Sequence, residues 1–529
     1  MKSQAIGGSR QGGMSLLEIT SQPAGNRAFL VGGRRLARNT AINLVGRMVP
    51  LLVAVVTMPY VIGHLGPDRF GLLSLAWMVV GYFALFNLGV GPATTKFVAD
   101  LLGKGERERL PELVWTAVIS QVCLGVMGGF LFVAGTPLLV DRLLRIPPGL
   151  RAQAHLIFLY MAVALPIDFA NGSMSGVLGA SQRFDLLNLV SIPSSALTYL
   201  VPVAAVWLGY GLPAIVLFLV LARATAIFVI VYCCFRLYPD LRSGVRFSPG
   251  LARRLLGFGG WVTVSGMVSP VLVYFDRFLI GSLISVAAVG FYTPPYMIST
   301  KLWILPASLA ATLFPAFSCS AGGESREWVR SALARSLKFL ILLAGPAALL
   351  LVFFARPLLT FWVGARFAAE GTLVLQILAV GVLMNSLAVV PYSLLQGIGR
   401  PDLTAKFHLV ELPIHVALAW FLVTRFGLAG AATAWAIRMG FDFFLLVVAA
   451  CWLTRTSPRL LAGRELGSSL GILAALAAGF AFVWISTHAL AVHAVLTASL
   501  GCGFLICAWR YALDADEKCQ IKLWLKASP

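Results

Sequence analysis

Charged residues are scarce in this sequence. Asp, Glu, Lys and Arg make up 12% of its 529 residues, whereas 59% are hydrophobic, and an ordinary soluble domain carries about 25% charged residues. The mean hydropathy is +0.88. A chain with so little charge would expose more apolar surface than water tolerates. The composition therefore excludes a water-soluble protein and predicts that lipid surrounds most of the chain.

Two motifs of ATP-driven and zinc-dependent chemistry are also missing. The sequence contains no GxxxxGK[ST] phosphate-binding loop and no HExxH motif. Its eight cysteines include no CxxC pair, and most lie in or beside apolar segments, where cysteine is a small packing residue. We therefore expect no catalytic residue, no metal and no cofactor, and we do not expect this chain to hydrolyse ATP.

The first 38 residues lack the short apolar core of a cleavable signal. They are polar and carry Arg10, Arg27, Arg34, Arg35 and Arg38. We expect this segment to be a cytoplasmic tail.

Long uncharged runs dominate the remainder of the chain. Because about 20 apolar residues cross the hydrocarbon core of a bilayer, these runs predict an all-α polytopic membrane protein with about fourteen transmembrane helices. The predicted spans are 41–62, 71–94, 113–135, 154–180, 187–208, 211–235, 257–284, 287–317, 336–354, 371–398, 405–424, 427–453, 466–487 and 490–509.

Basic residues outnumber acidic residues by 41 to 21, which gives a net charge of +20. If the N-terminus is cytoplasmic, most of the basic residues fall in the tails and in the cytoplasmic connectors, as the positive-inside rule requires. The charge is thus explained by membrane topology, and we do not expect nucleic acid binding. The same count predicts that both termini are cytoplasmic.

The sequence repeats itself at a shift of about 218 residues. A shift of this size contains six predicted spans, so both copies have the same orientation and are related by an axis along the membrane normal. The pattern predicts two parallel-repeat six-helix lobes around a central cavity, plus two C-terminal helices. The ordered matches pair Ile62-Gly63-x-Leu65 with Ile280-Gly281-x-Leu283, Gly105-Glu106 with Gly323-Glu324, Arg183-x-Asp185-Leu186 with Arg400-x-Asp402-Leu403, Gly211-Leu212 with Gly427-Leu428, and Arg223 with Arg438.

These observations divide the chain into five parts. They are a cytoplasmic N-terminal tail (1–38), an N-lobe with the first six spans (39–237), a C-lobe with the next six (251–454), two further spans (466–510) and a cytoplasmic C-terminal tail (511–529). Rocking of one such half against the other exposes a central site to each side of the membrane in turn.

Five stretches of the sequence carry a family resemblance. With them, the chain resembles the polysaccharide transporter family, the oligosaccharide flippases of the multidrug/oligosaccharidyl-lipid/polysaccharide exporter superfamily, over about residues 39–454. The resemblance implies two lobes around a cavity, a bacterial inner-membrane location and a lipid-linked oligosaccharide as cargo. Family members often carry an acidic residue near the position of Asn87, so this chain departs from the pattern there. The stretches are Gly89-Val-Gly-Pro-Ala-Thr-Thr-Lys96-Phe-Val-Ala99, Ala288-Val-Gly-Phe-Tyr292, Leu313-Phe-Pro-Ala-Phe317, Gln396-Gly-Ile-Gly-Arg400-Pro-Asp402-Leu-Thr-Ala-Lys406 and Gly427-Leu-Ala-Gly-Ala-Ala-Thr-Ala-Trp435.

Several charged side chains fall inside predicted spans, where each costs about 2.5–3.5 kcal/mol at a helix centre. We therefore expect them to face protein or water. Arg47, Asp276, Arg277 and Lys301 have no charged counterpart in the other half of the repeat, which favours contact with the cargo. A guanidinium matches a pyrophosphate well. Buried ion pairs, or side chains that reach for the membrane surface, are the alternatives for the three basic residues.

Other intramembrane charges favour different roles. Asp276 and Arg277 are adjacent and cannot share a helix face, so we expect one to contact a neighbouring helix and the other to face the cavity. Arg438 is repeated as Arg223, which suggests a structural role in each lobe, and Asp442 lies four residues farther on, where it can neutralise Arg438. A position for Arg438 in the cavity is the alternative.

Acidic residues and prolines supply the remaining site candidates. Glu411 and Asp168 are candidates for coupling to an ion. Glu411 shares a helix face with His408 and His415, but a metal would need further ligands, and a hydrogen-bonded polar stripe is the alternative. Pro50 and Pro270 lie at nearly equivalent places in the first and seventh spans and are candidate hinges or packing kinks.

The sequence and the resemblance together predict a flippase. It moves a polyprenyl-pyrophosphate-linked oligosaccharide from the cytoplasmic to the periplasmic leaflet by alternating access, for O-antigen, capsule or exopolysaccharide synthesis. The expected partners are this lipid, membrane lipids, a polysaccharide polymerase and glycosyltransferases, and we expect a monomer. The alternatives are a lipid II flippase, a multidrug exporter, and a polysaccharide polymerase or ligase. The short outer connectors 136–153 and 355–370 disfavour the last of these.

Overall fold

The structure of the protein is a computed structural model. It describes residues 24–85, 90–320, 326–455, 464–486, 490–515 and 517–519. Within these ranges the regular elements are all helical and no β-strand occurs. Ten helices among the described residues are long and apolar enough to cross a membrane. The chain is therefore a multi-pass α-helical membrane protein, as the apolar runs predict.

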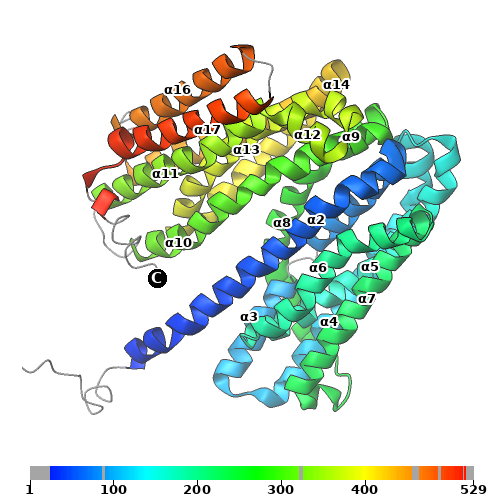
Figure 1. Cartoon of the computed structure of the whole chain (residues 1–529). Helices are drawn as coiled ribbons and strands as arrows, with labels where there is room; N and C mark the ends of the chain where they lie inside the picture. The colour runs from blue at the N-terminus through cyan, green and yellow to red at the C-terminus, as the bar shows by residue number, and fades with distance from the viewer. Residues whose placement is uncertain are drawn as a thin grey trace, which may run out of the picture.

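Figure 1 shows one group of helices formed by the first half of the chain. Within it, α5 packs against α4 and α7, and α6 packs against α2. The short helices η1 (Arg107–Arg109), η2 (Leu138–Leu143) and η3 (Pro239–Arg242) lie in the connections. The long helices are α2 (Ala24–Leu85), α3 (Val90–Lys104), α4 (Leu110–Pro137), α5 (Pro148–Ala180), α6 (Phe184–Trp207) and α7 (Leu212–Leu237).

The second half forms the other group of helices. In it α13 packs against α9, α10, α11, α12 and α14, while α16 packs against α11 and α17 packs against α16 (Figure 1). The elements are α8 (Pro249–Leu283), α9 (Val286–Thr300), η4 (Lys301–Trp303), α10 (Ile304–Ser320), α11 (Arg326–Phe353), α12 (Ala355–Val363), α13 (Ala365–Gly397), α14 (Pro401–Thr454), α16 (Arg464–Ser486), α17 (Leu490–Cys507) and η5 (Ala508–Ala512).

The helix boundaries depart from the predicted spans at several places. Helix α2 begins at Ala24, so part of the predicted tail is helical. Helices α2 and α14 each contain two predicted spans, which are separated by a single non-helical residue, Gly66 (φ 71°) and Gly427 (φ 58°). A left-handed glycine reverses the chain without a connector. The predicted span 287–317 is interrupted at η4, and α12 occupies the predicted outer connector 355–370. The total of fourteen spans stays a prediction.

Two equivalent connectors have the same conformation. The chain leaves α5 through Gln182 (φ 54°) and α13 through Gly399 (φ 77°), and both turns return a hydrogen bond from the next arginine to the helix, with N···O distances of 3.0 and 2.9 Å. These arginines then pair with an aspartate two residues on, Arg183 with Asp185 and Arg400 with Asp402, each at 2.9 Å. The hydrogen bond to the aspartate raises the pKa of each arginine. The repeat in sequence is therefore also a repeat in structure.

The two halves meet in a reciprocal contact between α2 and α9. One additional residue after Leu283 aligns Pro67 with Val286 and Gly71 with Gly290. A Cβ atom at Gly71 would overlap the carbonyl oxygen of Val286, and one at Gly290 would overlap that of Pro67. Each glycine therefore makes the same contact as its counterpart in the other half, and it also lies next to that counterpart, which is the pattern that a two-fold axis produces. Only glycine allows so close an approach of two backbones.

Further contacts join the halves at the same end of the helices. The backbone N–H of Arg145 donates to the carbonyl of Gly281 at 2.9 Å, and that of Val286 donates to the carbonyl of Arg145 at 3.4 Å. The indole Nε1 of Trp362 in α12 donates to the carbonyl of Val55 in α2 at 2.7 Å. Backbone contacts thus hold the halves together at the end where α8 meets α9.

Candidate functional site

A cavity of about 460 Å³ lies between the two halves, and we call it the central cavity. Helices α2, α6 and α7 contribute residues from the first half, and α8, α9 and η4 contribute residues from the second. A change in the relative position of the halves would therefore change its shape. It is lined by Ser74, Trp77, Met78, Gly81, Thr198, Tyr199, Arg223, Val273, Tyr274, Arg277, Thr293, Tyr296, Met297, Thr300, Lys301 and Trp303.

Three of these residues are basic. Arg223 forms an ion pair with Asp168 of α5, with its Nη1 at 2.9 Å from Oδ2. Arg277 and Lys301 have no acidic partner within 4.0 Å among the described residues. Two positive charges in this cavity are thus not neutralised by the part of the chain that the structure describes. A low-dielectric cavity with such an excess attracts anions.

Arg277 is held by aromatic rings. Its guanidinium carbon lies 4.0 Å from the centre of the Tyr296 ring and 5.5 Å from that of Tyr274. A desolvated cation–π contact is worth about 2 kcal/mol, which offsets part of the cost of burying the charge. The Nε of Arg277 is shielded from solvent and has no hydrogen-bond partner in the part of the chain that the structure describes. The rings therefore position the guanidinium at the wall of the central cavity.

Asp276, the preceding residue, points in a different direction. Its Oδ2 accepts a hydrogen bond from the hydroxyl of Tyr292 in α9 at 3.0 Å, and its Oδ1 lies 3.9 Å from Nε2 of His415 in α14. Asp276 therefore joins three helices and does not line the central cavity. Arg277 occupies that wall instead, as expected of adjacent positions on a helix.

A second cavity, of about 620 Å³, lies within the second half, and we call it the lateral cavity. It adjoins the central cavity, because Val273 and Trp303 line both. Its polar lining comes mainly from α13 and α14. The lining residues are Leu272, Val273, Trp303, Pro306, Ala307, Ala310, Asn385, Val389, Tyr392, Ser393, Gln396, His408, Trp435, Arg438, Met439 and Asp442.

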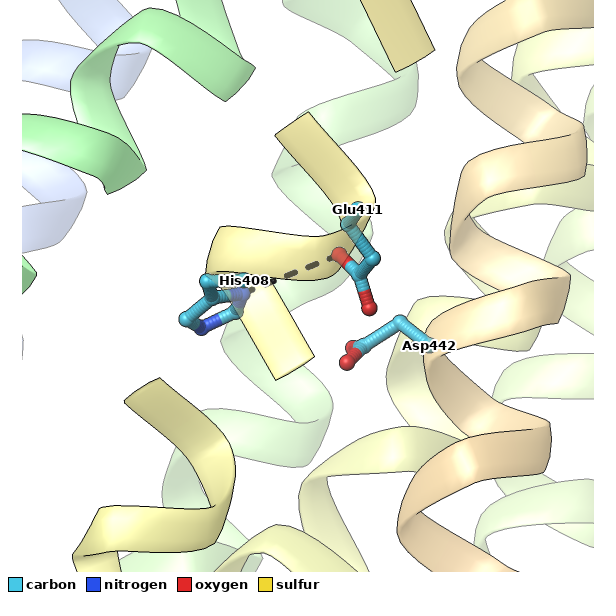
Figure 2. Close-up of side chains that lie close together, drawn as sticks. All are labelled: His408, Glu411 and Asp442. Carbon is cyan, nitrogen blue, oxygen red and sulfur yellow. Dashed lines mark ion pairs between the residues drawn. The ribbon is translucent and has the colours of Figure 1, made fainter. Parts of the chain in front are cut away.

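Beside the lateral cavity, His408, Glu411 and Asp442 come together (Figure 2). One ligand atom from each lies within 4.8 Å of the others. The Nδ1 of His408 lies 3.7 Å from Oε2 of Glu411. Spacing along the sequence identified the first two residues as sharing a face, but not Asp442 as the third donor, because it follows the break at Gly427.

Arg438 corrects one prediction. It does not pair with Asp442; its Nη1 lies 3.5 Å from Oε2 of Glu411, on the helix that precedes Gly427. The fold brings the two parts of α14 side by side, and this places the buried carboxylate of Glu411 next to the guanidinium of Arg438. This contact neutralises one carboxylate of the cluster. The remaining charge suits a proton or a monovalent cation better than a divalent metal.

The structure separates the predicted site residues into two groups. Arg277 and Lys301 share the central cavity, and Asp168 reaches it through Arg223, whereas Arg438 and Glu411 lie at the lateral cavity. The repeat predicts only a structural role for Arg223. The presence of Asp168, a second charge in a predicted span of the same half, could have indicated that the two residues belong to one site. The side chain of Arg47, in α2, and that of Pro270, in α8, lie outside the described part of the chain. Pro50 lies inside α2, and helical angles continue through it.

Comparison with known proteins identifies the chain. The family model described as "Polysaccharide biosynthesis protein" matches residues 36–320, and the model described as "MatE" matches residues 262–421. A Shigella flexneri protein named as a candidate O-antigen transporter is 30% identical over 412 residues, which cover 78% of this chain and 96% of that protein. The chain belongs to the polysaccharide biosynthesis protein family.

Solved structures show how this family member folds. The chain superposes on an inward-facing multidrug resistance MATE family transporter of the MOP superfamily with a TM-score of 0.69 at 16% identity, covering 78% of this chain and 98% of the other. It superposes on the lipid II flippase MurJ, in an inward closed conformation, with a TM-score of 0.69 at 12% identity, covering 89% and 98%. These similarities establish the fold that the family resemblance implies.

Proposed function

We propose that the protein flips a polyprenyl-pyrophosphate-linked oligosaccharide from the cytoplasmic to the periplasmic leaflet of the bacterial inner membrane. The observation that carries the proposal is the central cavity, in which Arg277 and Lys301 lack acidic partners among the described residues and to which both halves contribute. The name of the Shigella flexneri relative, an O-antigen transporter, supports the same cargo class.

The cavity suits the anionic part of such a cargo. The Arg277 guanidinium and the Lys301 ammonium bind the pyrophosphate, the polyprenyl chain stays in lipid and the sugars cross in water. An arginine fork gives two parallel hydrogen bonds to a phosphate, whereas lysine acts as a point charge. No bond is made or broken in this process, so the protein acts as a transporter and not as an enzyme.

Alternating access follows from the two halves. The segments 39–237 and 251–454 rock against each other, with Pro50 and Pro270 as candidate hinges, while 466–510 stays with the second lobe. Both termini, the tails 1–38 and 511–529, are cytoplasmic. The protein works as a monomer, takes its cargo from glycosyltransferases and delivers it to a polysaccharide polymerase.

Coupling is assigned to the buried acidic residues. Glu411, with His408 and Asp442, takes up a proton or a monovalent cation, and its contact with Arg438 responds to that uptake. The Asp168–Arg223 pair transmits charge changes to the central cavity. With Glu411→Gln, transport into inverted vesicles should no longer depend on an imposed ion gradient. Unchanged gradient dependence would remove Glu411 from this role.

The test of the function is complementation of a strain that lacks its O-antigen flippase, with protein abundance measured in parallel. Arg277→Glu should abolish surface polysaccharide, and Arg277→Lys should retain part of it. Arg425→Glu is the matched control, because Arg425 is exposed and lines neither cavity. Normal polysaccharide from both Arg277→Ala and Lys301→Ala would contradict the proposal. Rescue of a lipid II flippase deficiency instead would identify the cargo as lipid II.

A further inference from the structure

The central cavity is rich in aromatic side chains as well as in cations. Trp77, Tyr199, Tyr274, Tyr296 and Trp303 all line it. A site for a phosphate group alone requires donors and positive charge, which the basic side chains already supply. The rings therefore call for a second explanation. The C–H groups on one face of a pyranose ring are attracted to the negative face of an aromatic ring, so a sugar fits such a wall.

Two of these rings occupy equivalent positions of the repeat. With the same offset of one residue that aligns the two contacting glycines, Trp77 of α2 aligns with Tyr296 of α9. The ring of Tyr296 carries the Arg277 guanidinium at 4.0 Å. Among the described residues no cation lies over Trp77, and its ring neighbour in the cavity, Tyr199, meets it edge-on at 6.1 Å. One position thus holds a cation in the second half and none in the first.

The hydrogen-bonding groups of the cavity also match a sugar. The indole Nε1 atoms of Trp77 and Trp303 are shielded from solvent and have no hydrogen-bond partner among the residues that the structure describes. The hydroxyls of Thr293 and Thr300 donate to backbone carbonyls of their own helix, each at 2.8 Å, so their oxygens remain available as acceptors. Sugar hydroxyls donate and accept, and the cavity offers both functions next to the rings.

We propose that Trp77 and Trp303 form a subsite for the first sugar of the cargo, the monosaccharide attached to the pyrophosphate. This inference rests on the proposed function, and it adds the sugar to the cargo groups that the cavity recognises. Trp77 stacks against the pyranose ring, the two indole N–H groups donate to its hydroxyls, and Arg277 holds the neighbouring phosphate. Since Trp77 belongs to one half and Trp303 to the other, the subsite is complete only while the halves enclose the cavity.

The test compares lipids that differ only in the sugar. Purified full-length protein in lipid nanodiscs is titrated calorimetrically with geranylgeranyl pyrophosphate, and with the same lipid carrying one hexose or one N-acetylhexosamine from a panel. The wild-type protein should bind at least one glycosylated lipid about tenfold more tightly than the bare lipid, which corresponds to about 1.4 kcal/mol. Trp77→Leu should lose this preference and keep its affinity for the bare lipid. Trp77→Phe, which keeps a ring, should retain part of it.

The controls separate this inference from the proposed function. Arg277→Ala should weaken all the lipids by the same factor and leave the sugar preference intact. If the wild-type protein binds the bare and all glycosylated lipids equally, or if Trp77→Leu weakens them all equally, the subsite is wrong while the phosphate site stands. If the wild-type protein binds none of these lipids, the proposed function itself is wrong. The melting curve of Trp77→Phe should match that of the wild type. A retained sugar preference in this folded variant then shows that the loss in Trp77→Leu comes from the missing ring and not from unfolding.

Discussion

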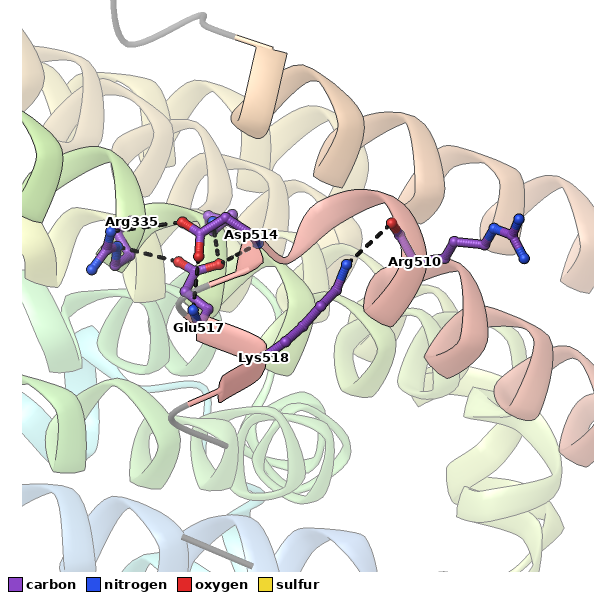
Figure 3. A network of polar contacts seen from close by, with 6 residues as sticks. Arg335, Arg510, Asp514, Glu517 and Lys518 are labelled. Carbon is purple, nitrogen blue, oxygen red and sulfur yellow. Dashed lines mark hydrogen bonds and ion pairs between the residues drawn. The ribbon is translucent and has the colours of Figure 1, made fainter. Parts of the chain in front are cut away.

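Lys338 of α11 and Glu517 of the C-terminal segment form an ion pair of 2.8 Å in which both side chains are buried, with exposures of 0% and 2%. Arg335 lies 3.2 Å from the other carboxylate oxygen of Glu517 (Figure 3). The segment also closes on itself: the N–H of Asp514 donates to the Glu517 carboxylate at 3.0 Å, and the N–H of Glu517 donates to the Asp514 carboxylate at 2.7 Å. Asp514 and Glu517, which follow α17 in the sequence, are thus fixed to α11.

Breaking this ion pair from one side should destabilise the protein. Glu517→Gln removes the carboxylate charge that contacts the buried Lys338 ammonium, and removing one partner of a buried pair costs about 3–5 kcal/mol. The double variant Lys338→Met/Glu517→Leu removes both charges and should recover most of the loss. Melting temperatures in detergent measure both effects. Lys518→Met is the control, since Lys518 is only half-buried and contacts a backbone carbonyl. A melting temperature of Glu517→Gln equal to that of the wild type would mean that the pair is solvated.

Gly71→Ala should force the two halves apart at their contact. The new methyl group would overlap the Val286 carbonyl, whereas Gly63→Ala on the same helix meets nothing within 4 Å and is the control. In a variant whose eight native cysteines are replaced, a Thr293→Cys substitution in the central cavity reports how readily a thiol reagent enters this cavity. An impermeant thiol reagent added outside should label it faster in Gly71→Ala than in Gly63→Ala. Equal labelling would show that this contact does not close the cavity.

Gln182 and Gly399 should respond in opposite ways to substitution. Gln182 occupies a left-handed conformation that costs a side-chain-bearing residue about 1–2 kcal/mol, so Gln182→Gly should raise the melting temperature and Gly399→Ala should lower it. Neither residue lines the central or the lateral cavity, and specific transport should not change. If a variant were present at normal abundance but did not transport, these connectors would take part in the movement of the two halves.

The Asp168–Arg223 pair permits a test of structure against cargo binding. Asp168→Asn leaves Arg223 without a counter-charge and should lower the melting temperature, and the double variant Asp168→Asn/Arg223→Gln should restore it. If Arg223 also contacts the pyrophosphate, the restored protein should transport less than the wild type. Full transport by the double variant would restrict Arg223 to a structural role.

Local patterns in the sequence predicted the helices but not their partners. Apolar runs and the repeat depend on residues close together in the chain or at a constant shift, so the all-helical fold followed from them. The partner of Arg438 did not follow, because helical spacing identifies Asp442 four residues on, and the true contact is Glu411, 27 residues away across a break.

Burial was equally hidden from composition. Lys338 lies near the start of the predicted span 336–354, and its side chain is fully buried against Glu517, 179 residues farther on. Trp77 looked like one aromatic residue among many in an apolar span. Its equivalence to Tyr296 became visible only when the reciprocal glycine contact fixed the offset of the repeat.

The contact between Gly71 and Gly290 bears on the ancestry of the protein. A residue touches its own counterpart only where a two-fold axis passes, so in an ancestral homodimer both positions were one residue. In such a homodimer a single substitution would have changed both residues of the contact at once. After a gene fusion each copy can change alone, and in this chain Arg277 and Lys301 stand in one half without charged counterparts while the glycines are matched. A parallel repeat predicts that this axis runs along the membrane normal, so in the proposed function we expect the matched pair to lie across the exit route and the cargo to leave only when the two halves separate.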